Sequence, residues 1–316
     1  MQYQAPKWLP NGHLQTIWPL AIKGRMPSMK RSRWNTPDGD FIDIDFLRGA
    51  GTRKVPLLVL FHGLEGSSRS HYARALMRQV SDQGWNGAVV HFRGCSGSPN
   101  KLGRAYHSGD ADEIDWIMRR MADKYKDGPI YAVGVSLGGN ALLCWLGRRR
   151  EEAFKLVTKA AAVSTPLDLT ASGMTLQKGF NKIYTRHFLK SMRRTAAEKA
   201  ERFPGLFDAQ RAQRAKTLFE FDDAFTAPVH GFKNVNDYWQ RSSSKPLLTQ
   251  IAVPTLIINA KNDPFLPRSA LPRKREVSRH VTLELTEEGG HVGFVSGTFP
   301  GNLNWLPDRL IRYFQS

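Results

Sequence analysis

Short apolar segments recur along the chain, and each is followed by a turn rich in glycine or serine and then by a stretch with helical periodicity. Segments of four to six residues are too short for helices, and their apolar character is typical of strands buried on both faces of a parallel sheet. The alternation predicts an α/β fold with helices on both faces of the sheet. The strands are expected at Leu57–Phe61, Gly87–Phe92, Ile130–Val135, Lys159–Ser164, Thr255–Ala260 and Val281–Leu285.

An antiparallel hairpin is expected ahead of these strands. Arg33–Asn35 and Phe41–Phe46 flank the turn Pro37-Asp38-Gly39, a pattern that predicts paired strands at the sheet edge. Apolar residues at helical spacing fill the stretches between the parallel strands and close the chain. Helices are expected at Ser70–Gln83, Ser108–Tyr125, Leu137–Arg148 and Trp305–Phe314.

The alternation stops between residues 166 and 245. No strand pattern occurs there, and the stretch contains basic, aromatic-bearing helical patterns such as Gln177–Met192 and Ala209–Phe221. We interpret residues 166–245 as a helical lid inserted after the sixth strand, an element that shapes a pocket and excludes water. The length of 316 residues suits one such domain, so we expect a single α/β domain over residues 1–316.

The amino-acid composition limits which partners and which cellular location are expected. The 46 Lys and Arg against 28 Asp and Glu give a formal charge of +18, which makes anionic membrane surfaces conceivable partners without indicating a fold. No nucleic-acid recognition motif accompanies this charge, so no nucleic acid is expected. The two cysteines, Cys95 and Cys144, are expected to be reduced. The first residues contain neither a signal-peptide core nor a membrane span, which favours a cytoplasmic protein.

The candidate nucleophile is Ser136. It stands in Gly134-Val135-Ser136-Leu137-Gly138, which matches G-x-S-x-G and lies directly between a predicted strand and a predicted helix. The chemistry needs this context, because the serine sits on a strained turn and neighbouring residues without side chains let its hydroxyl project. An isolated match in a loop would be weak, whereas this placement predicts a functional nucleophile.

A serine nucleophile needs a base and an acid that follow it in the chain order Ser, Asp or Glu, His. The base is His291, in a glycine-rich loop after the last strand, and the preferred acid is Asp263, directly after Thr255–Ala260. Asp168 is the alternative acid, although helix capping at the start of the lid would also explain it. The alternative for His291 is an ordinary surface histidine.

Two loops are expected to support the reaction. The backbone N–H groups of Leu64, in a His-Gly-x-x-Gly stretch, and of Leu137 would form the oxyanion hole. His62 is expected to hold its loop by a hydrogen bond, and Arg93 is expected to form a structural ion pair beneath the loops. No metal-ligand spacing is present, a cysteine nucleophile is disfavoured, and no cofactor is expected.

The chain resembles the YheT-like carboxylesterases of the α/β-hydrolase superfamily, which are related to plant embryogenesis-associated hydrolases and to animal proteins active on acyl lipids. The resemblance implies ester hydrolysis and the triad Ser136, Asp263 and His291. The sequence has Lys261-Asn262 before Asp263, where relatives often show an acidic pair, so the local charge differs. The resemblance rests on Asn11-Gly12-His13-Leu14-Gln15-Thr16, His62-Gly63-Leu64-Glu65-Gly66, Arg93-Gly94-Cys95, Gly134–Asn140, the lid stretch from Phe221-Asp222 to Tyr238, and the loops bearing Asp263 and His291.

These observations favour a serine esterase that acts through an acyl-enzyme on short- to medium-chain esters. One alternative is a lipase or phospholipase at membrane surfaces, and another is a non-catalytic binding protein that retains the fold. Weak contact with an anionic membrane would use cationic side chains of the lid, which are Arg186, Lys190, Arg193, Arg194, Lys199 and Arg202.

Overall fold

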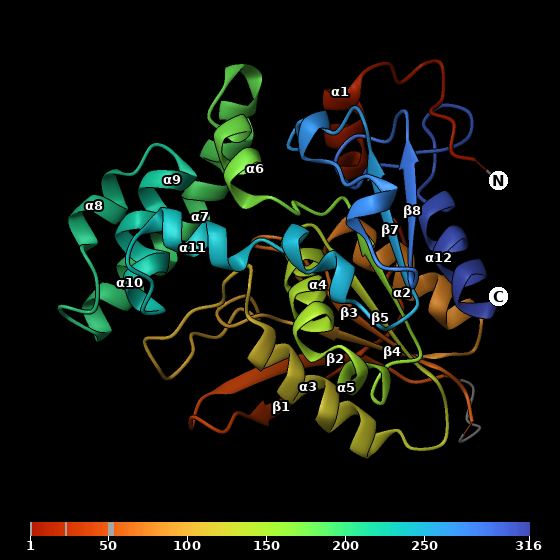
Figure 1. Ribbon diagram of the computed structural model, residues 1–316, viewed down its shortest axis with the longest axis horizontal. Coiled ribbons are helices and arrows are strands. Elements are labelled where there is room, and N and C mark those ends of the chain that lie inside the picture. The colour runs from red at the N-terminus through yellow and green to blue at the C-terminus, as the bar shows by residue number, and fades with distance from the viewer. Residues whose placement is uncertain (1, 23, 50–53) are drawn as a thin grey trace.

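The computed structural model describes residues 2–22, 24–49 and 54–316, and its strands form one twisted sheet (Figure 1). The strand order is β1-β2-β4-β3-β5-β6-β7-β8. The β1–β2 hairpin and the β2–β4 pair are antiparallel, and all other neighbouring strands are parallel, as the sequence predicts. The strands are β1 (Lys30–Asn35), β2 (Phe41–Leu47), β3 (Leu57–Phe61), β4 (Asn86–Val90), β5 (Ile130–Val135), β6 (Lys159–Val163), β7 (Thr255–Ala260) and β8 (Val281–Thr286).

Helices follow the strands and fill the segment between β6 and β7. The α-helices are α1 (Gly12–Ile17), α2 (His71–Asp82), α3 (Ala111–Lys124), α4 (Leu137–Arg149), α5 (Glu151–Phe154), α6 (Leu169–Leu176), α7 (Lys182–Arg202), α8 (Ala209–Arg214), α9 (Leu218–Phe221), α10 (Ala227–Val229), α11 (Val235–Ser242) and α12 (Trp305–Gln315). The 3-10 and π-helical segments are η1 (Trp18–Ala21), η2 (Gly179–Asn181), η3 (Asp222–Thr226), η4 (Lys245–Gln250), η5 (Arg268–Ala270) and η6 (Lys274–Glu276).

The central strands are buried on both faces because successive side chains point to opposite sides of the sheet. On β3, Leu57, Val59 and Phe61 pack into the core cluster that contains α3 and α4. Leu58 and Leu60 on the same strand pack into the cluster that contains α2 and α12. An unbroken apolar sequence is therefore what a strand with two covered faces requires.

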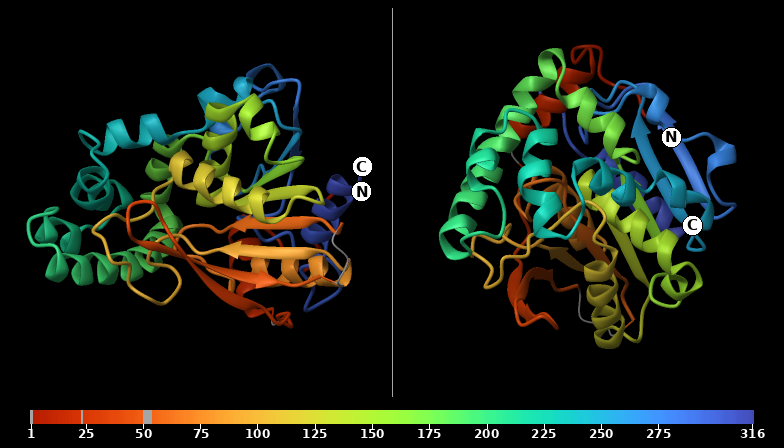
Figure 2. Two further views of the ribbon diagram at one scale, coloured as in Figure 1. Left: turned by 90° about the horizontal axis from the view of Figure 1, so that it is seen from below. Right: turned by 60° about the vertical axis from the view of Figure 1, so that its left-hand side comes forward.

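The segment between β6 and β7 forms its own helical group. Helices α6 to α11 stand beside the sheet and beyond its edge in the view of Figure 1, and both panels of Figure 2 show the same separation. A third apolar cluster holds the group together, and Phe265 and Leu266 from the loop after β7 also pack into this cluster. The helical group is thereby fixed over the loops that follow the strands.

Two of the predicted helix extents in this segment are wrong. The pattern over Ala209–Phe221 forms two helices, because α8 ends at Arg214 and the Thr217 side chain caps α9 by accepting a hydrogen bond from Glu220 N. The helix predicted over Gln177–Met192 begins instead at Lys182 and continues to Arg202. A local polar cap sets the start of α9, and a hydrophobic period does not report it.

The other predicted elements are present with small shifts of their ends. The two largest shifts are equal: β1 begins at Lys30 and not at Arg33, and α3 begins at Ala111 and not at Ser108, because the Asp110 side chain caps it by accepting from Glu113 N. Within the described ranges, no helix is both long enough and apolar enough to span a bilayer.

Candidate active site

Ser136 lies on the sharp turn between β5 and α4. Its backbone has φ 53° and ψ −120°, a left-handed conformation that costs free energy for a residue with a side chain. Its N–H donates to Val163 O at 2.8 Å, which ties the turn to β6. A Cβ atom on Gly134 would lie 2.5 Å from Gly138 O, and one on Gly138 would collide with backbone carbonyl oxygens at the end of β3. The turn therefore requires glycine at both positions.

Three side chains from separate loops form a hydrogen-bonded row. His291 Nε2 lies 2.9 Å from Ser136 Oγ, and His291 Nδ1 lies 2.8 Å from Asp263 Oδ2. The Asp263 side chain is fully buried, and its other oxygen accepts from Phe265 N at 2.8 Å. The Phe265 ring stacks on the imidazole with centroids 4.1 Å apart. The structure thus brings together the three residues that the sequence nominates.

The alternative acid has another role. Asp168 caps α6, where its side chain accepts a hydrogen bond from Ala171 N at 2.9 Å. This contact satisfies one of the exposed N–H groups of the first helical turn. The capping interpretation of Asp168 therefore agrees with its position, and Asp263 is the carboxylate that contacts the imidazole.

The loop after β3 presents backbone donors beside the serine. Leu64 and Leu137 line the same cavity as Ser136, and neither backbone N–H has a hydrogen-bond partner in the part of the chain that the structure describes. Tyr72 and Tyr106 hold the loop, because their hydroxyl groups accept from Gly63 N at 2.8 Å and from Glu65 N at 3.0 Å. These two unpartnered backbone N–H groups thus belong to residues that line the cavity together with Ser136.

His62 is a structural residue, as its sequence context predicts. It is fully buried, and burial lowers its pKa to about 3, so the ring is neutral. Phe92 N donates to His62 Nε2 at 3.1 Å, which leaves the proton on Nδ1 to donate to Gly63 O at 2.7 Å. The ring therefore links the loop after β3 to the loop after β4.

Arg93 is also structural. Its guanidinium is almost fully buried and lies 2.6 Å from Glu113, 2.9 Å from Asp38 and 3.3 Å from Asp40. A buried cation needs such partners because water no longer solvates it. These ion pairs join the β1–β2 turn, the loop after β4 and α3 beneath the active-site loops.

Helix α1 braces the histidine loop, a role that the sequence pattern does not reveal. Gln15 is fully buried, and its Oε1 accepts from Gly289 N and from Asn262 Nδ2, both at 2.9 Å. Thr16 Oγ1 accepts from the backbone N of His291 at 2.9 Å. The sequence shows the motif that contains these residues but not its contacts, because the contacted residues are more than 240 positions away in the chain.

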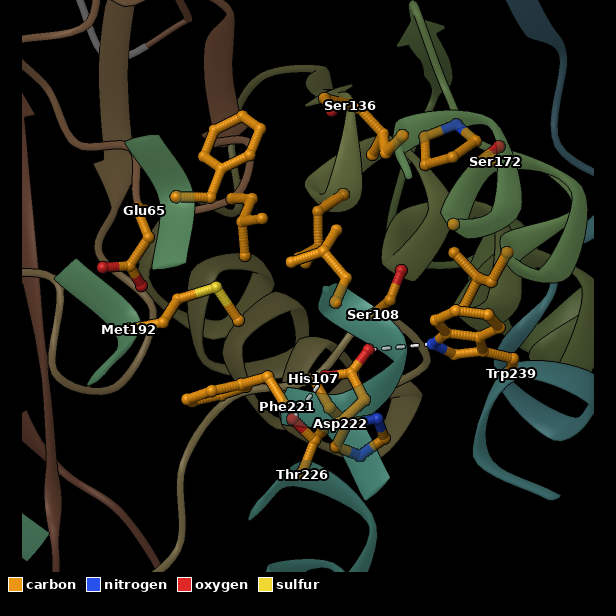
Figure 3. Close-up of a pocket in the computed structure, with 18 of the residues that line it drawn as sticks. Glu65, His107, Ser108, Ser136, Ser172, Met192, Phe221, Asp222, Thr226 and Trp239 are labelled. Atoms are coloured by element: carbon orange, nitrogen blue, oxygen red, sulfur yellow. Dashed lines mark hydrogen bonds between the residues drawn. The ribbon is translucent and has the colours of Figure 1, made fainter. Parts of the chain in front are cut away.

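An apolar cavity extends from Ser136 into the helical group (Figure 3). Its far end is polar: Asp222 accepts from Trp239 Nε1 at 2.8 Å and from Thr226 Oγ1 at 2.6 Å, and burial raises its pKa to about 6. The Ser172 hydroxyl faces the cavity and has no hydrogen-bond partner among the described residues. The apolar lining includes Leu64, Leu137, Leu169, Leu176, Phe188, Met192, Leu218, Phe221, Phe225 and Leu266.

The thiols do not compete with the serine. Cys95 and Cys144 are both unbridged, and burial raises the pKa of Cys144 to about 12 and that of Cys95 well above its usual value. A protonated thiol is a poor nucleophile. Among the described residues, no group of three His, Cys, Asp or Glu side chains is arranged to hold a metal ion.

Comparison of the whole sequence identifies relatives. Residues 56–298 match the family model described as alpha/beta hydrolase fold. The chain is 40% identical to YheT of Escherichia coli (strain K12), which is provisionally named an esterase, over 97% of this chain and 92% of that protein. It is 27% identical to human phospholipase ABHD3 over 99% of this chain and 78% of that protein. Embryogenesis-associated protein EMB8 of Picea glauca is 26% identical, with 99% and 72% covered.

Solved structures share the architecture. Est1E from Butyrivibrio proteoclasticus, solved with ferulic acid bound, has a TM-score of 0.58 at 14% identity and covers 90% of this chain and 98% of its own. Esterase EaEST from Exiguobacterium antarcticum has a TM-score of 0.57 at 19% identity, with 91% and 100% covered. At such identities the similarity establishes the fold alone. The family match and the sequence relatives establish more: the chain belongs to the α/β-hydrolase fold family and, within it, to the YheT-like branch.

Proposed function

We propose that this protein hydrolyses carboxylic esters by acyl transfer through Ser136. The observation that carries the proposal is the row from Ser136 through His291 to Asp263, which opens on an apolar cavity and lies beside two unpartnered backbone donors. The esterase name of YheT supports the same reaction class.

The first half of the reaction forms the acyl-enzyme. His291 Nε2 takes the proton of Ser136 Oγ as the oxygen attacks the ester carbonyl carbon, and Asp263 stabilises the imidazolium through Nδ1–H. The carbonyl oxygen becomes an oxyanion, which accepts hydrogen bonds from the N–H groups of Leu64 and Leu137. His291 then returns the proton to the leaving alcohol as the ester C–O bond breaks.

The second half releases the acid. His291 takes a proton from a water molecule, and the resulting hydroxide attacks the acyl carbon. The same oxyanion donors stabilise the second tetrahedral intermediate. The bond to Ser136 Oγ breaks, the serine regains its proton from His291, and the carboxylic acid leaves.

The cavity favours short- to medium-chain acyl groups. Its apolar part begins at Ser136 and ends at Asp222, whose carboxyl already holds two hydrogen bonds. An alkyl chain that reached Asp222 would bring carbon atoms against a buried polar group without supplying a partner, which is unfavourable. Acyl chains that stop before this carboxyl fit best.

We further infer that residues 166–245 act as the lid of a single domain spanning residues 1–316. Leu176, Phe188, Phe221 and Trp239 from this segment line the cavity, so the segment separates the acyl group from water. A cytoplasmic location belongs to the same proposal, and the two unbridged cysteines support it.

A lipase or phospholipase is the second candidate. The observation that favours it is the apolar cavity beneath a basic helical segment, together with relatives named phospholipase ABHD3 and, in Saccharomyces cerevisiae, monoacylglycerol lipase. The two candidates differ in one measurement: a lipase gains activity when its substrate forms vesicles or micelles.

The test compares p-nitrophenyl acetate, butyrate, octanoate and palmitate as substrates of the wild type and of Ser136→Ala. We expect turnover of butyrate and octanoate by the wild type and a loss of at least about 1000-fold in the variant. A fluorophosphonate probe should label the wild type at Ser136. Absence of both turnover and labelling in folded protein would exclude the serine mechanism and leave a binding protein.

A further inference from the structure

Exposed large apolar side chains are concentrated on one side of the molecule. Eight such side chains are exposed among the described residues. Single exposed apolar residues are ordinary on protein surfaces, so their grouping is the informative feature. Met174 lies on α6, and Phe154 lies on α5 at the opposite side in Figure 1. The remaining six form what we call the apolar face: Leu14, Ile17, Leu20, Phe180, Ile183 and Phe299.

Contacts between elements make the apolar face continuous. The His13 ring packs on Phe180 with centroids 4.6 Å apart, which joins α1 to η2. His13 Nδ1 also lies 3.1 Å from the Tyr184 hydroxyl on α7. At the other end, the Trp18 ring lies 5.7 Å from that of Phe299. Segments from three distant parts of the chain thus present one surface.

This surface adjoins the active site. Tyr184 contacts the Phe265 ring, with centroids 4.8 Å apart, and Phe265 stacks on His291. Thr16, between Leu14 and Ile17 on α1, holds the backbone of His291. Helix α1 therefore contacts the backbone of His291 directly, and α7 contacts the imidazole through Phe265.

The segments around α1 and the first half of α7 contain basic residues and no acidic ones. Residues 2–37 and 169–197 contain no Asp or Glu. Lys178, Lys182, Arg186 and Lys190 are exposed at four-residue spacing, and none of their side chains has a hydrogen-bond or ion-pair partner in the described part of the chain. Residues four apart share one side of a helix, so Lys182, Arg186 and Lys190 form a cationic stripe on α7 next to Ile183, and Lys178 lies just before η2.

Three cations in the far half of α7 have partners within the chain, and the burial of Lys199 corrects that part of the expectation from sequence. Lys199 is buried, and its ammonium donates to Leu102 O and Arg104 O, both at 3.0 Å. Arg202 donates to Lys101 O at 3.3 Å, and Arg193 donates to Ala215 O. These three cations are held by backbone carbonyl groups, whereas Arg194 on the same half of the helix is exposed.

We propose that the apolar face is a docking surface for an anionic lipid bilayer. Apolar side chains beside unpaired cations fit the acyl boundary of a bilayer and its phosphate groups together, whereas a nucleic acid would leave the apolar side chains without partners. Docking would bring the lipid next to α1, which holds the backbone of His291, and so near the site of the proposed reaction. The inference deepens the proposed function and rests on it only for the acyl chain.

The test measures vesicle binding and hydrolysis separately. Binding is measured by co-sedimentation with phosphatidylcholine vesicles, with and without phosphatidylglycerol, using Ser136→Ala so that lipid is not consumed. Hydrolysis is measured with soluble p-nitrophenyl butyrate and wild-type Ser136. We expect binding to anionic vesicles only, and weaker binding at high salt.

Matched variants locate the surface. Phe180→Ser with Ile183→Ser should lower the partition coefficient at least about tenfold, because two large apolar groups no longer enter the lipid. Phe154→Ser, with an equally exposed ring on α5, should leave it unchanged. For charge, Lys182→Gln with Arg186→Gln should reduce anionic binding, whereas exposed controls elsewhere, Lys126→Gln with Lys155→Gln, should not.

Three outcomes would overturn the docking proposal. The first is the absence of binding to anionic vesicles, and the second is an equal loss for Phe154→Ser. The third is a dimer in solution that dissociates when Phe180 and Ile183 are replaced, which would assign the surface to a second copy of the chain. Turnover of the soluble ester depends on Ser136 and needs no vesicle. A failure of the esterase proposal can therefore be distinguished from a failure of the docking proposal.

Discussion

Replacing Thr16 by valine tests whether α1 positions His291, the proposed catalytic base. The substitution keeps the shape of the side chain and removes Oγ1, which accepts the backbone N–H of His291 at 2.9 Å and donates to Gly12 O at 2.6 Å. Gly12 O retains its helical partner, but the N–H of His291 loses its acceptor. Thr16 is buried, so water does not replace the lost contact.

The expected magnitude follows from that one unsatisfied group. A buried N–H without a partner costs about 1–3 kcal/mol, and the loop lowers this cost by shifting toward another acceptor. A shift moves His291 Nε2 relative to Ser136 Oγ, now 2.9 Å away. We expect kcat to fall about tenfold, which corresponds to about 1.4 kcal/mol of activation free energy. KM should be unchanged because Thr16 does not line the cavity.

The assay is p-nitrophenyl butyrate hydrolysis under conditions where circular dichroism shows both proteins folded. Thr16→Ser is the matched control, because it retains the hydroxyl and removes only a methyl group. It should stay within about threefold of the wild type, since removing one methyl group costs about 1 kcal/mol or less here. If Thr16→Val and Thr16→Ser have the same kcat, the bond to His291 does not position the ring and the reasoning is refuted.

Three further predictions concern single positions. Gly138→Ala should abolish fluorophosphonate labelling, because the new Cβ collides with carbonyl oxygens at the end of β3; full labelling would contradict this. Arg93→Met should lower the free energy of unfolding in urea by about 3–5 kcal/mol, because Glu113 loses its buried partner, and Arg186→Met is the exposed control. Asp222, whose pKa is raised to about 6 by burial, binds a proton more tightly in the folded protein. The protonated carboxyl therefore stabilises the fold below about pH 4, and this stabilisation is lost as pH rises through about 6. The urea midpoint of the wild type should fall over that pH range, and the fall should be smaller in Asp222→Asn. An equal fall in both proteins would contradict the reasoning.

Strand identity followed from sequence because it depends on local pattern. The run Leu57–Phe61 is apolar at every position, and the structure buries alternate side chains in two separate clusters. The single helix predicted over Ala209–Phe221 failed because Thr217 caps a new helix there. A cap depends on one side chain and one backbone group, so the hydrophobic period carries no trace of it.

The proposed nucleophile, base and acid could be nominated from sequence because such residues occupy fixed places in this fold. Ser136 stands between a strand and a helix, and Asp263 and His291 stand in loops directly after strands whose ends meet at one edge of the sheet. The topology of a parallel sheet brings such loops together. The order of motifs along the chain therefore indicated which side chains would meet.

Sequence alone determined the fold class, the three candidate catalytic residues and the basic charge. Only the tertiary structure decided that Gln15 and Thr16 hold the histidine loop, that Asp222 lines the cavity and that Lys199 is buried while Lys182 is exposed. The physical reason is the range of the interactions: strand periodicity and the nucleophile turn are encoded by neighbours in the chain. Burial and hydrogen bonding between distant segments arise only when the packed sheet and helices bring those segments into contact.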